Sequence, residues 1–188
     1  MPAPTEDLLR MLNIGCVFLA NNHIYDFKMP GLQATISMLN ELGIYHTGAG
    51  WFSDHIDPVI INNTDIRIAF IAYIDKSTNP KTEYFPELLI NYFDVDKVLS
   101  DNHNISNTVD KLIINIHWGV DYSFYPTPEQ IYISRRLVDA GTDVIMGHHP
   151  HTIQPYETYY RGLIFYSLGG LTFGDNIKEG KTSIQSLY

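Results

Sequence analysis

The sequence predicts an α/β protein in which helices pack on a layered sheet, and two observations lead to that class. Apolar runs long enough for buried strands alternate along the chain with amphipathic segments that carry helix caps. The chain also has 188 residues, of which 45% are hydrophobic, so it can bury one core. We therefore expect a single domain over residues 1–188.

The first part of the chain is expected to form two helices around a strand. Thr5 can cap a short helix, and residues 14–19 follow it as a fully buried strand. Pro30 at a first helical position opens a second helix over residues 31–42. Its buried face is expected to consist of Leu32, Ile36 and Leu39.

The middle of the chain reads as a hairpin, a long loop, a short helix and a strand. Residues 59–61 and 66–74 are strand-like and flank a polar turn, which is typical of a hairpin. Residues 75–93 contain two prolines and are expected to be a loop, and residues 94–100 suit a short helix. Residues 112–116 are apolar and predict a further buried strand.

The last part begins with a strong helix signal. Thr127, Pro128 and Gln130 form a capping box with proline at its first helical position, and Gly141 ends that helix. The remaining strands are expected at residues 143–146, 156–160 and 163–167, with a tight Arg161-Gly162 turn between the last two.

Polar clusters that contain at least one histidine follow three of these strands. They are Asn21-Asn22-His23, the segment that starts at His117, and Gly147-His148-His149-Pro150-His151. Residues two apart in an extended segment project to the same side, so His149 and His151 can converge on one cation or on two neighbouring ones. Open α/β sheets bind ligands at the carboxyl ends of their strands, so the clusters are predicted to meet. The alternative is that these histidines are structural groups, which is the commoner role of an isolated histidine.

Five motifs in this order resemble the bacterial capsule synthesis protein CapA family, which is similar to the calcineurin-like metallophosphoesterases. The motifs are residues 20–26, 117–119, 126–130, 147–151 and 166–169, within a resemblance that spans about residues 19–174. The resemblance implies a metallophosphoesterase-like layered α/β/β/α sandwich and a link to capsule or poly-γ-glutamate synthesis.

The resemblance also implies a set of metal ligands. Asn22, His117 and His149 match the ligands of one metal, and His151 matches a ligand of a second. An amide oxygen and imidazoles suit Mn, Fe or Zn, whereas magnesium and calcium prefer more oxygen ligands. The complete family site holds two such divalent transition metals.

His23 is the catalytic candidate. It follows the liganding asparagine, so it should point past the metal toward the substrate, where an imidazole can protonate a leaving oxygen. Asp26 lies three residues further on and would orient the ring. The alternative role is that His23 only caps its loop through Asp26.

Several other side chains are candidates for the substrate side of the site. His148 either lines that side or fills the turn, and Trp118 and Tyr122 could wall a pocket, although aromatic residues more often belong to the core. Asp121 could face the site, but the family resemblance leads us to expect a glutamate near that position. Asp75 ends a buried strand and either supports a metal ligand from behind or is a turn residue, and the turn role is the expected one.

Histidines and the cysteine outside the motifs are expected to be structural. Cys16 is the single cysteine and lies in an apolar run, so we expect a buried thiol without a disulfide. Surface or capping roles are the expectation for His46, His55 and His103.

Composition limits the partners. The net charge is −9 and no cluster of Lys and Arg occurs, which argues against nucleic acid and anionic membranes. The resemblance implies a phosphorylated or polyglutamate-related small molecule or polymer as the partner. The apolar run of residues 14–20 is too short to span a bilayer, so the chain as written is expected to be soluble. Family members often carry a membrane anchor and act outside the cytoplasm.

The departures from the family pattern leave two functions open. Relatives begin with a Gly-Asp strand and a second acidic segment whose carboxylates hold and bridge the metals, and we expect the sandwich to be incomplete at the N-terminus and short at the C-terminus. One hypothesis is a metal-dependent phosphoesterase or related hydrolase. The other is a noncatalytic remnant that keeps the fold and binds either at most one metal or a partner chain. In that case the missing carboxylates come from another polypeptide or are not supplied at all. This chain alone is then expected to have weak or no activity.

Overall fold

A six-stranded sheet is the central element of the computed structural model, which describes residues 5–51, 57–78 and 88–170. Its strand order is β4-β5-β7-β8-β10-β9. The strands are β4 (Val59–Asn63), β5 (Ile66–Ile74), β7 (Lys111–His117), β8 (Val144–His148), β10 (Gly162–Phe165) and β9 (Tyr156–Tyr159). The four inner strands are parallel, and β4 and β9 are antiparallel at the two edges. The carboxyl ends of β5, β7 and β8 therefore lie at one edge of the sheet.

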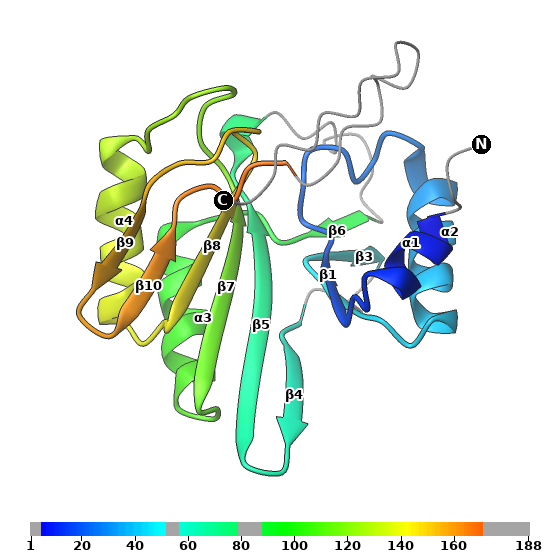
Figure 1. Cartoon of the computed structure of the whole chain (residues 1–188), viewed down its shortest axis with the longest axis horizontal. Helices are drawn as coiled ribbons and strands as arrows, with labels where there is room; N and C mark the ends of the chain where they lie inside the picture. Colours follow the sequence, from blue (N-terminus) through cyan, green and yellow to red (C-terminus); the bar gives the residue numbers. More distant parts are fainter. Residues whose placement is uncertain (1–4, 52–56, 79–87, 171–188) are drawn as a thin grey trace.

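Two helices cover one face of this sheet, as Figure 1 shows: α3 (Val95–Ser106) and α4 (Pro128–Asp139). Alternate residues of the inner strands point toward these helices and form the main core. Leu112 and Ile114 of β7, Ile145 of β8 and Ile164 of β10 are at most 1% exposed. This burial explains why the apolar runs of the sequence predict these strands well.

The N-terminal lobe consists of α1 (Thr5–Met11), β1 (Cys16–Phe18), α2 (Lys28–Glu41) and β2 (Tyr45–Thr47). β1 and β2 form a separate parallel pair, and β3 (Ala49–Trp51) pairs with β6 (Leu88–Ile90). Leu32, Ile36 and Leu39 are the buried face of α2, as predicted. Ala20 packs against Ala72 and Ile74 on the face of β5 that α3 and α4 leave uncovered. The predicted α/β class and its layered arrangement are thus confirmed.

Several predicted boundaries differ from the structure. The strand predicted at residues 14–19 has only three residues, and they are half-buried, because β1 pairs with β2 alone instead of joining the large sheet. α2 begins two residues before Pro30, which is tolerated because N–H groups in the first turn have no intrahelical partner. α3 continues to Ser106, beyond the predicted residue 100. The short strands β2, β3 and β6 were not predicted.

The β9–β10 hairpin turns one residue earlier than predicted, at Tyr160 and Arg161. Tyr160 adopts a φ of 46°, so a tyrosine occupies the left-handed position. Gly162 already belongs to β10, where a Cβ atom would lie 2.5 Å from the Val138 side chain. The glycine is therefore required by close packing against α4 and not by the turn.

The start of α4 is as predicted. Thr127 Oγ1 accepts a hydrogen bond from the Gln130 N–H at 3.1 Å, and Gln130 Oε1 accepts one from the Thr127 N–H at 2.9 Å. No helix among the described residues is long and apolar enough to cross a membrane.

Candidate metal centre

The three polar clusters predicted from the sequence meet at the carboxyl edge of the sheet. His117 and His148 end the neighbouring parallel strands β7 and β8 and are paired in register. The loop after β1 places Asn22 Oδ1 at 3.0 Å from His117 Nε2. The rings of His117 and His149 have centroids 4.9 Å apart. The structure thus brings together residues that are far apart in the sequence.

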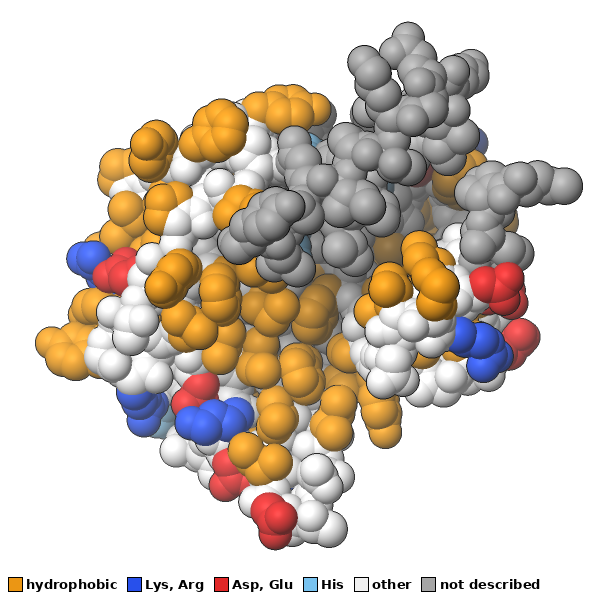
Figure 2. Space-filling view, in the orientation of Figure 1, with side chains coloured by type: hydrophobic (Ala, Val, Ile, Leu, Met, Phe, Trp, Pro, Cys, Tyr) orange, Lys and Arg blue, Asp and Glu red, His pale blue; other side chains and the backbone are white. Residues whose placement is uncertain are grey.

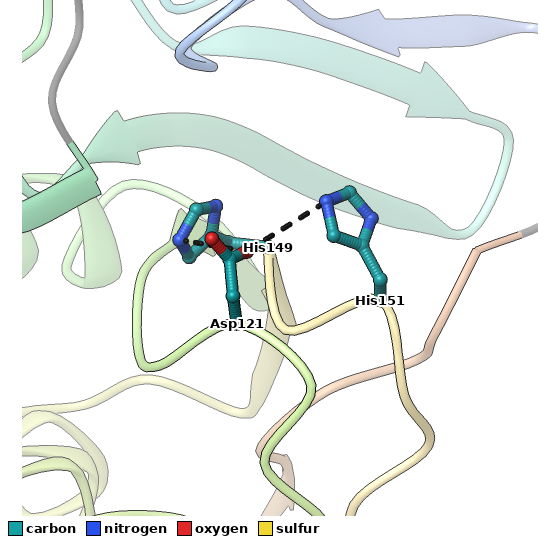
Figure 3. A group of neighbouring side chains, drawn as sticks. All are labelled: Asp121, His149 and His151. Carbon is teal, nitrogen blue, oxygen red and sulfur yellow. Dashed lines mark ion pairs between the residues drawn. The ribbon is translucent and has the colours of Figure 1, made fainter.

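A second group shares His149 with the first. Asp121 Oδ1 lies 3.5 Å from His149 Nε2 and 3.8 Å from His151 Nε2. Figure 3 shows the carboxylate of Asp121 between the two imidazole rings. One ligand atom from each of these three residues lies within 4.8 Å of the other two. Asp121, which the sequence left in doubt, thus supplies the carboxylate of this group.

The spacing of these atoms fits a divalent transition metal. Zinc binds nitrogen and oxygen ligands at about 2.0–2.1 Å, so two ligand atoms on a tetrahedral ion are roughly 3.3 Å apart. The separations in the two groups, 3.0, 3.5 and 3.8 Å, are close to that distance. His149 Nδ1 is buried and has no hydrogen-bond partner within the described segments. The donor set of imidazole, amide and carboxylate therefore suits zinc, manganese or iron.

The backbone of the histidine loop is held in a strained geometry. His149 has a φ of 101° and His151 a φ of 61°, which side-chain-bearing residues adopt rarely. A Cβ atom on Gly147 would lie 1.9 Å from the Tyr166 carbonyl oxygen, so only glycine fits there. Such strain costs on the order of 1–3 kcal/mol per residue and is concentrated at functional sites.

Burial favours the neutral form of three histidines at the centre, His117, His148 and His149. It lowers the pKa of His117 to about 3, and the neighbouring imidazoles of His149, His148 and His151 contribute to this decrease. Burial likewise lowers the pKa of His148 to about 4 and lowers that of His149, which the nearby Asp121 partly offsets. A metal ligand must be a deprotonated imidazole, so the site is ready for a cation at neutral pH.

The lowered pKa values predict an acid-sensitive fold for the metal-free protein. Between the unfolded pKa of 6.5 and the folded values, the unfolded chain takes up protons that the folded chain does not. The free energy of unfolding should therefore fall as the pH drops from about 7 toward 4, by up to about 1.4 kcal/mol per pH unit for each of His117 and His148. Urea titrations at several pH values, with a chelator present, measure this slope.

His148→Gln should flatten the slope, and His103→Gln serves as the matched control. His103 is exposed in the last turn of α3, so His103→Gln controls for the replacement of a histidine as such. An equal slope in the wild-type protein and in His148→Gln would contradict the assignment of this acid sensitivity to His148.

His23 and Asp26 line a cavity of about 380 Å³ beside the metal centre. His23 Nδ1 is 2.8 Å from Asp26 Oδ2, so the carboxylate orients the ring and leaves Nε2 for another partner. Asn22, Asp121 and His149 border the same cavity. The structure therefore places the predicted proton donor and several predicted ligands around one space.

Two residues of this cavity were not singled out from the sequence. Ser77 and Thr78 follow β5 and border the cavity together with His23 and His149. The feature of the sequence that could have identified them is their position just after the end of a buried strand. Asp75 is a turn residue, as expected, because its Oδ1 accepts a hydrogen bond from the Ser77 N–H at 2.8 Å.

His148 faces a different cavity, of about 490 Å³, between the sheet and the N-terminal lobe. Its Nε2 atom is buried and has no hydrogen-bond partner among the residues with described positions. Asn115, two residues before His117 on β7, borders the same cavity with its Nδ2 atom equally unsatisfied. Asn115 was not singled out from the sequence, although it is a polar residue inside an otherwise apolar strand and could have been found in that way. The cavity wall formed by α1 and β1 is apolar.

The two aromatic candidates for substrate binding, Trp118 and Tyr122, differ in position. Trp118 does not wall a pocket, because it is 1% exposed, packs against Phe93 and donates its indole N–H to the Tyr166 carbonyl at 3.4 Å. Its assignment to substrate binding was wrong, since the side chain turns into the core under α3 and α4. Tyr122 is exposed at the rim, with its ring centroid 5.8 Å from that of His151, and stays a candidate.

The residues outside the motifs have the following positions. Cys16 is a free thiol that is half-buried and not buried as expected; it borders the 490 Å³ cavity, and burial raises its pKa to about 11. His46 is buried, not at the surface, with Nε2 3.2 Å from Asn40 Oδ1 of α2. His103 is exposed, as expected, and His55 lies outside the described residues.

Solved structures share this fold. The 5'-nucleotidase precursor of Thermus thermophilus superposes with a TM-score of 0.59 at 15% identity, over 89% of this chain and 36% of that chain. The sulfate thiohydrolase SoxB of Thermus thermophilus gives 0.58 at 11% identity, over 89% and 30%. This chain therefore has the same fold as these two proteins.

Sequence comparisons identify the family. The capsule biosynthesis protein CapA of Bacillus anthracis is 32% identical over 180 residues, which cover 90% of this chain and 43% of that protein. The PGA biosynthesis protein CapA of Bacillus subtilis is 29% identical over 177 residues, covering 88% and 44%. This chain spans less than half the length of either relative. The model of the bacterial capsule synthesis protein PGA_cap matches residues 1–175, and the chain therefore belongs to that family.

Proposed function

We propose that this chain is a metal-dependent hydrolase-type domain that acts on phosphoryl esters or related acyl bonds in the synthesis of capsule or poly-γ-glutamate. The supporting observation is the convergence of Asn22, His117, His149, His151 and Asp121 beside the His23 cavity. The names of the two CapA relatives support the link to capsule and PGA synthesis.

The proposed ligands form two overlapping sets. Asn22, His117 and His149 would hold one cation, and Asp121, His149 and His151 lie where a neighbouring cation would bind. A divalent metal supplies Lewis-acid polarisation of a phosphoryl oxygen and lowers the pKa of a nearby water.

His23 is proposed to protonate the leaving oxygen. Asp26 fixes its Nδ1 atom, so the free Nε2 can face a substrate in the 380 Å³ cavity that both residues line. The ring is largely exposed, with 66% of the side chain accessible, which suits a group that must exchange protons with solvent and substrate. The substrate proposed for this cavity is a phosphorylated or polyglutamate-related small molecule or polymer.

The test is turnover of a chromogenic phosphoester by the purified chain. The protein is first stripped with a chelator and then assayed with added manganese, zinc, iron or no metal. Turnover that returns only with a transition metal supports the proposal. Absence of turnover with every metal and with several ester types would favour the noncatalytic role.

The second candidate is a noncatalytic domain that binds one metal or a partner chain. It is favoured by the charge of the donor sets, because amide and imidazole ligands bring no negative charge and Asp121 supplies the one carboxylate of its group. Two divalent ions about 3.5–4 Å apart normally require more compensating charge. The unsatisfied atoms of Asn115 and His148 in the larger cavity also leave room for polar groups of another chain.

Metal stoichiometry tests the argument from the charge of the donor sets. We expect the chain alone to hold at most one transition metal tightly, measured by elemental analysis after gel filtration. Asp121→Asn keeps the shape of the side chain but removes its charge, and it should weaken metal binding by about 10-fold or more. Glu129→Gln, an exposed carboxylate in the first turn of α4, is the control and should have no effect. Two tightly held metals in the wild-type chain, reduced to one in Asp121→Asn, would identify Asp121 as a bridge and overturn the one-metal expectation.

A further inference from the structure

Ser77 borders the 380 Å³ cavity beside the metal centre, and the proposed chemistry gives it no role. The described residues of the cavity wall that already have a role are the proposed metal ligands and the proposed proton-donor pair: Asn22, Asp121, His149, His23 and Asp26. The other two described residues of this wall are Ser77 and Thr78. A substrate held in the cavity therefore lies beside one or both of these side chains.

The hydroxyl groups of Ser77 and Thr78 differ in their availability. Thr78 is 5% exposed, and its Oγ1 atom donates a hydrogen bond to the Asp75 carbonyl oxygen at 2.7 Å. Ser77 is exposed, and its N–H donates to Asp75 Oδ1 at 2.8 Å. The Ser77 hydroxyl has no hydrogen-bond partner in the described ranges of the chain. Of the two hydroxyl groups, that of Ser77 is therefore the one that can donate to a bound molecule.

The turn that carries Ser77 is tied to the metal centre through the backbone. Residues Lys76–Thr78 form a short 3₁₀ helix just after β5. The Asp75 N–H donates to the His117 carbonyl oxygen at 2.9 Å, so the start of the turn is attached to the end of β7. The Thr78 N–H donates to the Asp75 carbonyl oxygen at 3.1 Å and closes the turn. A donor that is held in place before a ligand arrives loses little conformational freedom on binding.

Positive charge is scarce at this cavity. None of the described residues that border it is Lys or Arg, and Asp26 and Asp121 are acidic. Lys76, next to Ser77, contacts the Tyr92 ring instead, with its Nζ atom 5.2 Å from the ring centroid. On the face shown in Figure 2, the Lys and Arg side chains are scattered, and several lie beside acidic ones. An anionic group in the cavity therefore depends on the metal and on neutral hydrogen-bond donors.

We propose that the Ser77 hydroxyl donates a hydrogen bond to a phosphoryl oxygen of the substrate and that Ser77 is a substrate-binding residue of this cavity. This assignment rests on the proposed function, because it names the group that meets an oxygen turned away from the metal. A hydrogen bond from a neutral donor to a charged oxygen changes affinity by about 10-fold or more. Asp75 is the positioning residue, since its carboxylate accepts the Ser77 N–H and so fixes the turn.

Binding of inorganic phosphate tests this assignment without any turnover. Phosphate is titrated by calorimetry into the full chain, loaded with manganese and freed of excess metal. Ser77→Ala should weaken phosphate binding by about 10-fold or more, whereas Ser77→Thr keeps the hydroxyl and should bind phosphate nearly as well as the wild-type protein. Ser100→Ala replaces an exposed serine on α3 and is the matched control, which should leave the affinity unchanged. Metal content and thermal unfolding of each variant check that the metal and the fold are retained.

The role of Ser77 is overturned if the manganese-loaded wild-type chain binds no phosphate, or if Ser77→Ala binds it as tightly as the wild-type chain. The proposed function is judged separately, by turnover of the chromogenic phosphoester. Weaker phosphate binding in Ser77→Ala, without turnover in the wild-type chain, would keep the phosphate contact and reject the hydrolase. Turnover in the wild-type chain with an unchanged kcat/KM in Ser77→Ala would keep the hydrolase and reject the role of Ser77.

Discussion

His149→Ala is expected to abolish measurable binding of transition metal at micromolar concentration. His149 is the residue that both ligand sets share, since it lies beside His117 in one set and beside Asp121 in the other. Loss of an outer-shell partner typically lowers metal affinity about 10–100-fold, so loss of this shared ligand should lower it by at least about 100-fold. Isothermal titration with zinc or manganese, on protein stripped with a chelator, measures the change.

The matched control for this prediction is His103→Ala. His103 is an exposed histidine on α3, away from the strand ends, and its loss should leave the affinity unchanged. Alanine at position 149 also changes the backbone strain, because His149 has a φ of 101°, so thermal unfolding should be recorded in parallel. An affinity in His149→Ala within a few-fold of the wild-type value would show that the cluster is a structural group of histidines and not a metal centre.

The second large effect concerns His23. If the phosphoesterase activity is present, His23→Ala should lower kcat by about 10²–10⁴-fold, because a positioned general acid contributes that much to the rate. Metal affinity should stay the same, since His23 belongs to neither ligand set. Asp26→Asn should cause a smaller loss, on the order of 10-fold, because it removes only the group that orients the ring.

The choice of substrate makes this prediction specific to proton donation. An ester with a nitrophenolate leaving group needs no proton as the bond breaks, whereas an alkyl ester does. The loss in His23→Ala should therefore be large for the alkyl ester and small for the nitrophenyl ester. An equal loss for both esters would assign His23 to substrate binding or to loop structure. No loss for either would remove it from the mechanism.

The residue pattern predicts which elements form the large sheet and which residues meet at its edge. The apolar runs of β5, β7 and β8 are buried against α3 and α4. Strands buried in this way consist of consecutive apolar residues, which can be recognised in the sequence. Parallel neighbours end at the same edge, so the residues that follow β7 and β8 must come together whatever the details of the loops. His117 and His149 could therefore be placed side by side from their positions in the chain.

The predictions failed where tertiary contacts outweigh local pattern. Trp118 follows His117 in a motif, yet its large apolar ring gains more by packing under the helices than by facing a polar cavity. β1 has the composition of a buried strand, but it pairs only with β2 and is half-buried. His46 has no apolar pattern around it that marks burial, and its contact with Asn40 of α2 accounts for its position.

The sequence by itself thus determined the layered α/β class, the family motifs and the convergence of His117 and His149, because strand direction fixes where strand ends lie. Asn22 follows β1, which lies outside the large sheet, so its contact with His117 depends on the tertiary structure. Only the tertiary structure decided that Asp121 joins His149 and His151 and that His148 turns to the other cavity. These features depend on loop conformations such as the positive φ of His149, and on which faces of the elements meet, and no local pattern of residues encodes either.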